Sequence, residues 1–276
     1  MKLLSRSLLL VWVLSGSGPG LAADVAQPAA AAATAVLTQA HAHNDYEHAR
    51  PLRDALEQGF GSIEADVWLV DGRLLVAHTL AEVVPGRTLQ SLYLDPLRER
   101  IRQNGGRVYR DGPACTLLVE VKSAAEPTTA ALLQVFAEYT NMLTRFTDTN
   151  TMTNALTIIL TGNRSTTLVA AQACRWAALD GTLADLGTGA AASLVPLISG
   201  DWSENFQWRG AGSFPDGERQ KLRQLVAQAH AQGRRLRFWE APDQPAGWRE
   251  LQAAGVDLIG TDDLAGLAAL LRAPAR

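Results

Sequence analysis

The sequence of 276 residues is poor in cysteine, with only Cys115 and Cys174. A structural zinc site needs four ligands, so these two thiols cannot form one on their own. Each cysteine stands near the start of a segment that we expect to be a strand. A disulfide between them is compatible with an exported protein, and two free thiols are the alternative.

The sequence also lacks an excess of basic residues. Lysine and arginine number 25 against 28 acidic residues, which gives a formal net charge of -3 and a pI of about 6.0. No basic stripe is present, so we expect no nucleic-acid partner. After the N-terminal segment no stretch is apolar enough to span a bilayer, so we expect no transmembrane helix.

The N-terminal segment has the pattern of a secretory signal peptide. Basic residues within the first six positions precede an apolar run over 8–14, and small residues follow. The run is too short to cross a bilayer as a helix. We predict a signal peptide over 1–23, cleavage near Ala23, and a secreted or periplasmic mature chain. The Ala/Pro-rich residues 24–34 are predicted to be a disordered leader.

Residues 35–276 are predicted to form a single α/β domain. Apolar strands that alternate with helices are typical of a parallel sheet covered on both faces. About eight such strands in about 240 residues match a (β/α)8 TIM barrel. No glycine-rich phosphate turn follows the first strand, which argues against a doubly wound open sheet. The expected strands span 36–42, 62–70, 74–77, 116–121, 156–160, 175–179, 194–198, 236–239 and 256–259. The expected helices span 51–58, 95–103, 127–145, 215–232, 248–254 and 264–271.

Ionisable residues stand two apart in the predicted strands. Because side chains alternate along a strand, Glu64 and Asp66 share one face, and Glu120 and Lys122 share another. Charged side chains are rarely buried in strands unless they are paired or hold a metal. Catalytic residues of a TIM barrel lie at the C-terminal ends of its strands. The residues that fall there are His43, Glu64, Asp66, Glu120, Lys122, Trp239 and Asp262.

The three carboxylates indicate a site for a hard cation. Glu64, Asp66 and Glu120 offer oxygen ligands and no sulfur, which suits one Mg²⁺ or Ca²⁺ rather than zinc. Protonated Lys122 cannot be a ligand, so we expect it to contact an anion, most simply a phosphate. A cation and a lysine together would stabilise the charge that develops on a phosphoryl group.

Histidine is scarce, and none of the five lies between His78 and His230. His43 and His78 come from different strands or loops, so one can accept a proton from the attacking oxygen while the other protonates the leaving oxygen. His41 lies one pleat deeper and is expected to be structural. An amidohydrolase-type barrel would use His41, His43 and Asp262, but it needs histidines on the middle strands and is therefore disfavoured.

Further residues near strand ends are expected to shape a substrate pocket. Aromatic rims suit a sugar, an inositol or a lipid headgroup. Asn44 is placed either to contact the metal or to orient His43, and the sequence leaves both open. The predicted pocket residues are Asn44, Tyr46, Asn163, Arg164 and Trp239.

Together these motifs resemble the glycerophosphodiester phosphodiesterase and phosphatidylinositol-phospholipase-C-like superfamily. The phrases around residues 43–46, 64–68 and 92–97 most resemble the altered-inheritance-of-mitochondria protein 6 family. The resemblance implies a TIM barrel, a divalent metal and phosphodiester hydrolysis. It assigns metal binding to Glu64, Asp66 and Glu120, acid–base roles to His43 and His78, and phosphate contact to Lys122.

We therefore predict an exported, divalent-metal-dependent phosphoric diester hydrolase that acts on a glycerophosphodiester or a phospholipid-headgroup substrate. Either water or a neighbouring substrate hydroxyl could attack, the latter giving a cyclic phosphate. The first motif reads His43-Asn44-Asp45 where glycerophosphodiesterases carry His-Arg-Gly, so the headgroup stays open. The alternative is a non-catalytic barrel that binds a carbohydrate or a phospholipid headgroup. No protein partner can be inferred.

Overall fold

The computed structural model describes residues 35–274. The predicted signal peptide and leader lie outside these residues. Among the described residues, no helix is long and apolar enough to cross a membrane. Cys115 is buried, Cys174 is exposed, and both are free thiols.

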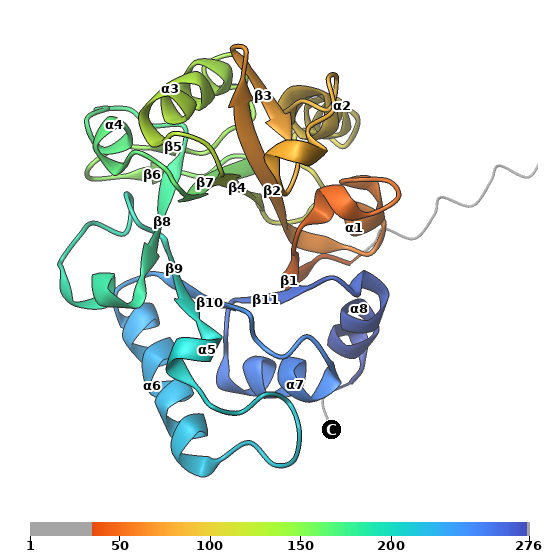
Figure 1. The fold of residues 1–276 in the computed structure, drawn as a ribbon, viewed down its shortest axis with the longest axis vertical. Coiled ribbons are helices and arrows are strands. Elements are labelled where there is room, and N and C mark those ends of the chain that lie inside the picture. The colour runs from red at the N-terminus through yellow and green to blue at the C-terminus, as the bar shows by residue number, and fades with distance from the viewer. Residues whose placement is uncertain (1–34, 275–276) are drawn as a thin grey trace, which may run out of the picture. The chain divides into compact units, whose positions relative to one another are not determined.

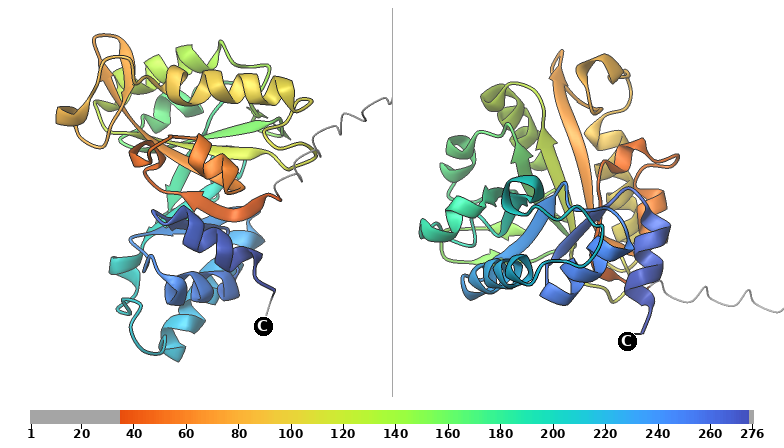
Figure 2. Two further views of the ribbon diagram at one scale, coloured as in Figure 1. Left: turned by 90° about the vertical axis from the view of Figure 1, so that its right-hand side faces the viewer. Right: turned by 60° about the horizontal axis from the view of Figure 1, so that its bottom comes forward.

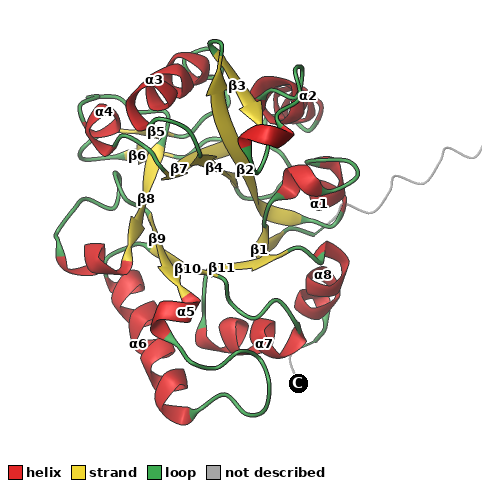
Figure 3. Cartoon of the chain, in the orientation of Figure 1, coloured by secondary structure: helices red, strands yellow, loops and turns green. Residues whose placement is uncertain are grey.

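Eight parallel strands close into a barrel, which confirms the predicted fold class. The first strand pairs in parallel with both the second and the last, so the ring is complete. Figure 1 looks into this ring, and Figure 3 shows the strands inside a circle of helices. The barrel strands are β1 (Leu37–Ala42), β2 (Phe60–Val70), β4 (Cys115–Val121), β7 (Leu156–Gly162), β8 (Ala178–Thr182), β9 (Leu197–Asp201), β10 (Arg235–Trp239) and β11 (Leu258–Thr261).

Helices cover the outside of the ring, and the main apolar core lies between them and the strands. They are α1 (Arg53–Glu57), α2 (Asp95–Gln103), α3 (Ala125–Phe136), α4 (Thr166–Ala170), α5 (Trp202–Asn205), α6 (Asp216–Ala231), α7 (Pro245–Ala254) and α8 (Leu264–Arg272). A second, smaller cluster joins Leu118, Ile159, Leu197 and Leu258. Leu118 and Glu120 share the interior face of β4, so this cluster lies beneath the polar end of the barrel.

The hairpin after β2 forms as predicted. Asp71 and Gly72 have φ values of 48° and 75°, the positive values that a tight hairpin turn requires. The return strand β3 (Arg73–Val76) pairs antiparallel with β2. Figure 2 shows the hairpin reaching past the neighbouring strands. The hairpin thereby brings His78 back to the end of the barrel.

The long helix predicted over 127–145 is wrong in its second half, because α3 ends at Phe136. Beyond it the chain runs beside β7, where Thr144 N donates to Leu156 O at 2.7 Å and Leu156 N donates to Met142 O at 3.0 Å. Strand-like pairing therefore replaces the helix. Two short strands follow, β5 (Arg145–Phe146) and β6 (Thr151–Met152).

Two predicted strands begin later than expected. β8 covers 178–182 rather than 175–179, and β9 covers 197–201 rather than 194–198. Arg175 instead exchanges backbone hydrogen bonds with Phe146, outside the barrel. The shift places Asp180 and Ser199 within strands, with their side chains inside the barrel.

Candidate active site

A cavity of about 630 Å³ opens at the C-terminal ends of the barrel strands. Most of the residues that the motifs singled out line it, namely His43, Asn44, Glu64, His78, Glu120, Lys122, Arg164 and Trp239. Asp66 lies just beneath its surface and is fully buried. Two of the predicted pocket residues, Tyr46 and Asn163, do not line the cavity.

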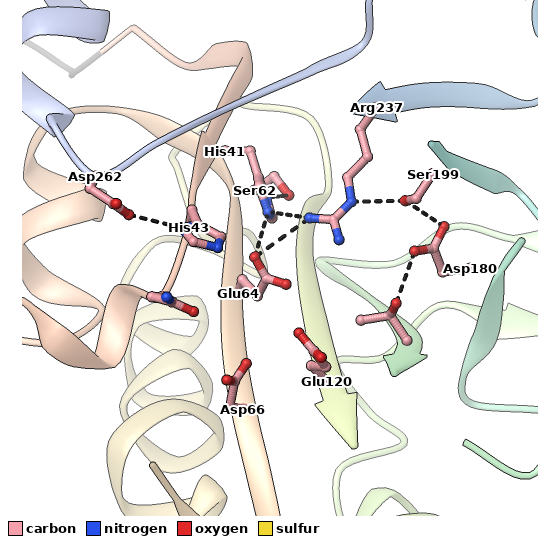
Figure 4. A network of polar contacts seen from close by, with 12 residues as sticks. His41, His43, Ser62, Glu64, Asp66, Glu120, Asp180, Ser199, Arg237 and Asp262 are labelled. Carbon is pink, nitrogen blue, oxygen red and sulfur yellow. Dashed lines mark hydrogen bonds and ion pairs between the residues drawn. The ribbon is translucent and has the colours of Figure 1, made fainter. Parts of the chain in front are cut away.

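The three predicted metal ligands do come together. Glu64, Asp66 and Glu120 each present an oxygen within 4.8 Å of the other two. They come from β2 and β4, whose register sets Asp66 beside Glu120. Figure 4 shows the three carboxylates turned toward one space between these strands.

Asp66 carries the clearest sign that this space suits a cation. Its Oδ2 accepts a hydrogen bond from Tyr46 Oη at 2.7 Å, whereas its Oδ1 is buried without any partner. Burial, and then the charge of Glu120, raise the pKa of Asp66 to about 6. A buried, unpartnered carboxylate oxygen is costly. The donor set therefore fits a hard divalent cation, which would supply the missing partner.

Lys122 provides the positive charge on this side of the cavity. Its Nζ lies 2.9 Å from Glu120 Oε1 and 3.1 Å from Asp66 Oδ2. Burial lowers the pKa of Lys122, but its hydrogen bond to Glu120 and the charge of Asp66 outweigh burial and raise it. The ammonium therefore stays charged and cannot serve as a metal ligand.

His43 is oriented by the carboxylate of Asp262, the residue that directly follows β11. Its Nδ1 lies 2.9 Å from Asp262 Oδ1, and no hydrogen bond within 35–274 engages Nε2. Burial lowers the pKa of His43, yet the charge of Glu64 and the hydrogen bond to Asp262 raise it above the usual value. The free Nε2 on a cavity-lining ring is what proton transfer requires.

His78, like His43, has its Nδ1 engaged by neighbouring side chains and its Nε2 free. Its Nδ1 lies 3.2 Å from Tyr46 Oη and 3.3 Å from Asp66 Oδ2. A capping box made by Thr79 and Glu82 fixes the chain immediately after it. Among the described residues nothing is hydrogen-bonded to His78 Nε2, so this nitrogen too is available.

Tyr46 has a different place from the one predicted. Only 4% of it is exposed, and its hydroxyl lies 2.8 Å from Asn44 Oδ1 as well as 2.7 Å from Asp66 Oδ2. The phenol therefore connects Asp66, a predicted metal ligand, and His78 to the loop after β1. Asn163, the other displaced residue, donates to Ser123 O at 2.8 Å.

The two remaining pocket residues line the cavity from strands other than those that carry the carboxylates. Arg164 donates to Gly162 O at 2.9 Å and also to Asp180 O, so its guanidinium bridges the ends of β7 and β8. Trp239 is 42% exposed at the end of β10. Arg164 therefore lines the cavity beside the strand of Glu120, and Trp239 lines it from across the barrel.

The sequence reasoning missed a buried polar network that crosses the barrel. Arg237 on β10 lies 3.5 Å from Glu64 and donates to Ser199 Oγ at 2.8 Å, and Ser199 donates to Asp180 at 2.8 Å. Figure 4 shows this chain of contacts from β8 to β2. A signal was present, because Arg237 is a charged residue within the predicted strand 236–239, as Glu64 and Asp66 are within theirs.

His41 is buried inside the barrel. Its Nδ1 lies 2.8 Å from Ser62 Oγ, and Nε2 lies near both Glu64 and Arg237. Burial is the main cause that lowers the pKa of His41. This placement fits the structural role expected of His41.

Three comparisons bear on this site. Residues 30–179 match the model of the AIM6-like phosphodiesterase domain. Altered inheritance of mitochondria protein 6 from Eremothecium gossypii is 30% identical over 265 residues, which cover 83% of this chain and 68% of that protein. Its homolog from Arthroderma benhamiae is 29% identical over 255 residues, covering 81% of each chain.

The solved structure of glycerophosphodiester phosphodiesterase from Agrobacterium tumefaciens has a similar fold. The TM-score is 0.51 at 16% identity, and the match covers 85% of this chain and 99% of that one. At this identity the likeness concerns the fold alone.

Proposed function

The chain belongs to the AIM6-like phosphodiesterase family, and from that premise we propose that it is a divalent-metal-dependent phosphoric diester hydrolase. Its substrate would be a glycerophosphodiester or a related phospholipid-headgroup diester. We further propose that the chain is exported, on the basis of the signal-peptide pattern in its first 23 residues. The partner implied is thus a small or lipid-derived phosphodiester.

One observation carries the proposal. One cavity brings together three carboxylates, one lysine and two histidines. The carboxylates keep oxygens without a hydrogen-bond donor, and each histidine keeps an Nε2 without a hydrogen bond among residues 35–274. Asp66 Oδ1 is buried without a partner, and it belongs to a group of three carboxylates whose oxygens lie within 4.8 Å of one another, where one cation would satisfy it. A single divalent cation, Mg²⁺ or Ca²⁺, held by Glu64, Asp66 and Glu120 would act there as a Lewis acid toward the phosphoryl group.

The protein side chains account for the remaining steps. Lys122 lies beside the carboxylates with a charged ammonium, so it can bind a phosphoryl oxygen and stabilise the charge that grows on it. His43 and His78 both line the cavity, and each has an Nδ1 held by a carboxylate and an Nε2 without a hydrogen bond among residues 35–274. One removes the proton of the attacking oxygen, and the other protonates the leaving oxygen.

The part of the cavity formed by the ends of β7 to β10 would receive the headgroup. Arg164 and Trp239 line it, together with hydroxyl-bearing residues at the ends of β7 to β9. The hydrogen-bonding groups suit an oxygen-rich headgroup, and an exposed aromatic ring suits the apolar face of a glycerol or sugar unit. The Agrobacterium relative in fold carries the name of a glycerophosphodiester phosphodiesterase, which agrees with this substrate class.

The test is hydrolysis of bis-(p-nitrophenyl) phosphate by the mature chain, with EDTA, Mg²⁺, Ca²⁺ or Mn²⁺. We expect turnover with a divalent metal and none with EDTA. His43→Ala and His78→Ala should each lower kcat by about 100-fold or more, because each loses one proton transfer. His230→Ala is the matched control, since His230 pairs with Asp257 at the end of α6 and does not line the cavity.

A panel of glycerophosphodiesters and lysophospholipids then identifies the headgroup. Turnover that survives in both His43→Ala and His78→Ala would contradict the proposed roles. Metal binding without hydrolysis of any diester in the panel would identify the chain as a non-catalytic ligand-binding barrel instead.

A further inference from the structure

The predicted metal ligands share one feature, seen first in Asp66 and Glu120. Each has one oxygen held by a donor of the protein and one oxygen that is free. Asp66 Oδ2 meets Tyr46 and Lys122, whereas Oδ1 has no partner. Glu120 Oε1 meets Lys122 at 2.9 Å, whereas Oε2 receives no hydrogen bond from residues 35–274. A carboxylate held in this way offers a cation a single oxygen.

Glu64 is held by a cation from the opposite side of the barrel. Arg237 Nη1 lies 3.5 Å from Glu64 Oε2 and 3.0 Å from His41 Nε2. A guanidinium can only donate, so its contact with His41 Nε2 places the His41 proton on Nδ1, which faces Ser62 Oγ at 2.8 Å. Arg237 is then the donor that faces Glu64 Oε2, and Oε1 stays free.

Arg237 is itself fixed in direction. Its Nε donates to Ser199 Oγ at 2.8 Å, and Ser199 Oγ donates to Asp180 Oδ1 at 2.8 Å. Asp180 Oδ2 accepts a further hydrogen bond from Thr161 Oγ1 at 3.0 Å. These side chains are buried, so the direction of the guanidinium is set by the network and not by solvent.

The number of oxygens that each carboxylate gives distinguishes two cations. Mg²⁺ requires near-ideal octahedral geometry and keeps several waters, whereas Ca²⁺ takes six to eight oxygens and often binds both oxygens of a carboxylate. We propose that Arg237 is a positioning residue that makes this site select Mg²⁺ over Ca²⁺, because it engages Glu64 Oε2 and leaves Oε1 as the only ligand atom of Glu64. The inference rests on the cation site of the proposed function, and not on hydrolysis.

The test compares the Mg²⁺ and Ca²⁺ affinities of the wild-type chain and Arg237→Met by isothermal titration calorimetry. Both ions carry two charges, so the lost arginine charge changes their attraction alike, and the ratio of affinities reports the available oxygens. We expect the ratio of Ca²⁺ to Mg²⁺ affinity to rise by about tenfold in Arg237→Met. The double variant His41→Phe/Arg237→Met removes both neighbours of Glu64 Oε2 and should show at least as large a rise.

Arg235→Met is the matched control. Arg235 lies two residues earlier on the same face of β10 and donates to Thr116 Oγ1 at 3.2 Å instead of to a site carboxylate. We expect its ratio to stay within about twofold of the wild type, because no ligand is repositioned. Circular dichroism melts first establish that each variant is folded, because removing a buried arginine leaves Glu64 without its counter-charge.

If Arg237→Met does not fold, Ser199→Ala takes its place. That variant keeps the charge of Arg237 but removes the acceptor of its Nε, so the ratio should rise in the same direction by less. An unchanged ratio in the folded variants, or tighter Ca²⁺ than Mg²⁺ binding by the wild type, would overturn the inference. A wild-type chain that binds neither ion would refute the cation site itself, whereas ion binding without diester hydrolysis would refute only the hydrolase.

Discussion

Two walls of the same cavity differ in whether their buried polar atoms have hydrogen-bond partners. The carboxylate wall, made by Glu64, Asp66 and Glu120 on β2 and β4, gathers three acidic groups and leaves oxygens unused. The arginine wall, made by Asp180, Ser199 and Arg237 on β8 to β10, joins its groups to one another. A wall whose atoms are satisfied needs no ligand, whereas the carboxylate wall has places for one.

Glu64 and Asp66 show the difference within one strand. Burial alone would raise the pKa of Glu64, but the positive charge of Arg237 is the largest opposing cause, and the pKa lies below the usual value. Burial, and then the charge of Glu120, raise the pKa of Asp66 to about 6. Burial raises the pKa of both carboxyl groups, so their different charged partners account for the opposite directions of the two shifts.

The largest expected effect comes from Glu120→Ala. Removing one of three ligands should lower metal-dependent hydrolysis by about 100-fold or more, since the remaining pair cannot hold a divalent ion tightly. The metal-free protein should be at least as stable as the wild type, because a like charge beside Asp66 is gone. Hydrolysis assays and urea unfolding in EDTA measure the two effects.

Glu126→Ala is the control for this variant, because Glu126 is exposed in the first turn of α3. Full metal-dependent activity in Glu120→Ala would contradict a three-carboxylate site. A marked loss of metal-free stability would instead assign Glu120 to the scaffold.

Asp45 offers a third case, a buried carboxyl group with neither a metal role nor an arginine. It accepts hydrogen bonds from Leu52 N and Tyr93 Oη, and burial raises its pKa to about 6. A raised folded pKa adds stability that is fully present below about pH 4 and is lost as the pH rises through about 6. The shift from 3.8 to about 6 corresponds to about 3 kcal/mol.

We therefore expect the wild type to lose up to about 3 kcal/mol relative to Asp45→Asn between pH 4 and pH 7. Urea unfolding of both proteins across this range measures the difference. Parallel pH profiles would show that Asp45 keeps an ordinary pKa, and that burial alone does not shift carboxyl groups here.

Asp180→Asn should break the arginine wall. Asp180 accepts from Ser199 and Thr161, and its charge offsets that of Arg237. Its loss should destabilise the protein by about 2 kcal/mol, the cost of weakening buried hydrogen bonds to a charged group. Chemical denaturation measures this cost, with the exposed Asp216→Asn as control. A variant as stable as the wild type would show that the network contributes little to folding.

The smallest effect is expected for Asp262→Asn. Asp262 is 67% exposed, yet its Oδ1 holds His43 Nδ1 at 2.9 Å. The amide can still bond the ring but carries no charge, so kcat should fall by about tenfold, with KM little changed. Steady-state kinetics on bis-(p-nitrophenyl) phosphate check this. A change confined to KM would place Asp262 in substrate binding.

Much of the fold and of the carboxylate wall could be predicted from the sequence, because both depend on patterns among residues that are close in the chain. Strand and helix alternation gave the barrel, and pairs two apart such as Glu64 with Asp66 put their side chains on one face. The arginine wall depends on strand register. A shift of three residues in β8 and β9 moved Asp180 and Ser199 from predicted loops into the barrel, and no local pattern reports such a shift.

Two other misses have the same origin in tertiary contacts. Tyr46 looked like a rim residue, but the turn after β1 folds it under the cavity against Asp66. The helix predicted up to residue 145 ends at Phe136 because the following segment pairs with β7. In both cases contacts with distant parts of the chain, which the local sequence pattern does not contain, determined the outcome.

The most direct measurement is the change in melting temperature on adding Mg²⁺ to the metal-free wild type, Glu120→Ala and Asp180→Asn. An ion that binds only the folded state raises the melting temperature, and the rise grows with the logarithm of the ion concentration once that exceeds Kd. If the carboxylate wall is the cation site and the arginine wall is a self-satisfied scaffold, Mg²⁺ should stabilise the wild type and Asp180→Asn and leave Glu120→Ala unchanged. An equal rise in Glu120→Ala, or no rise in the wild type, would contradict the account.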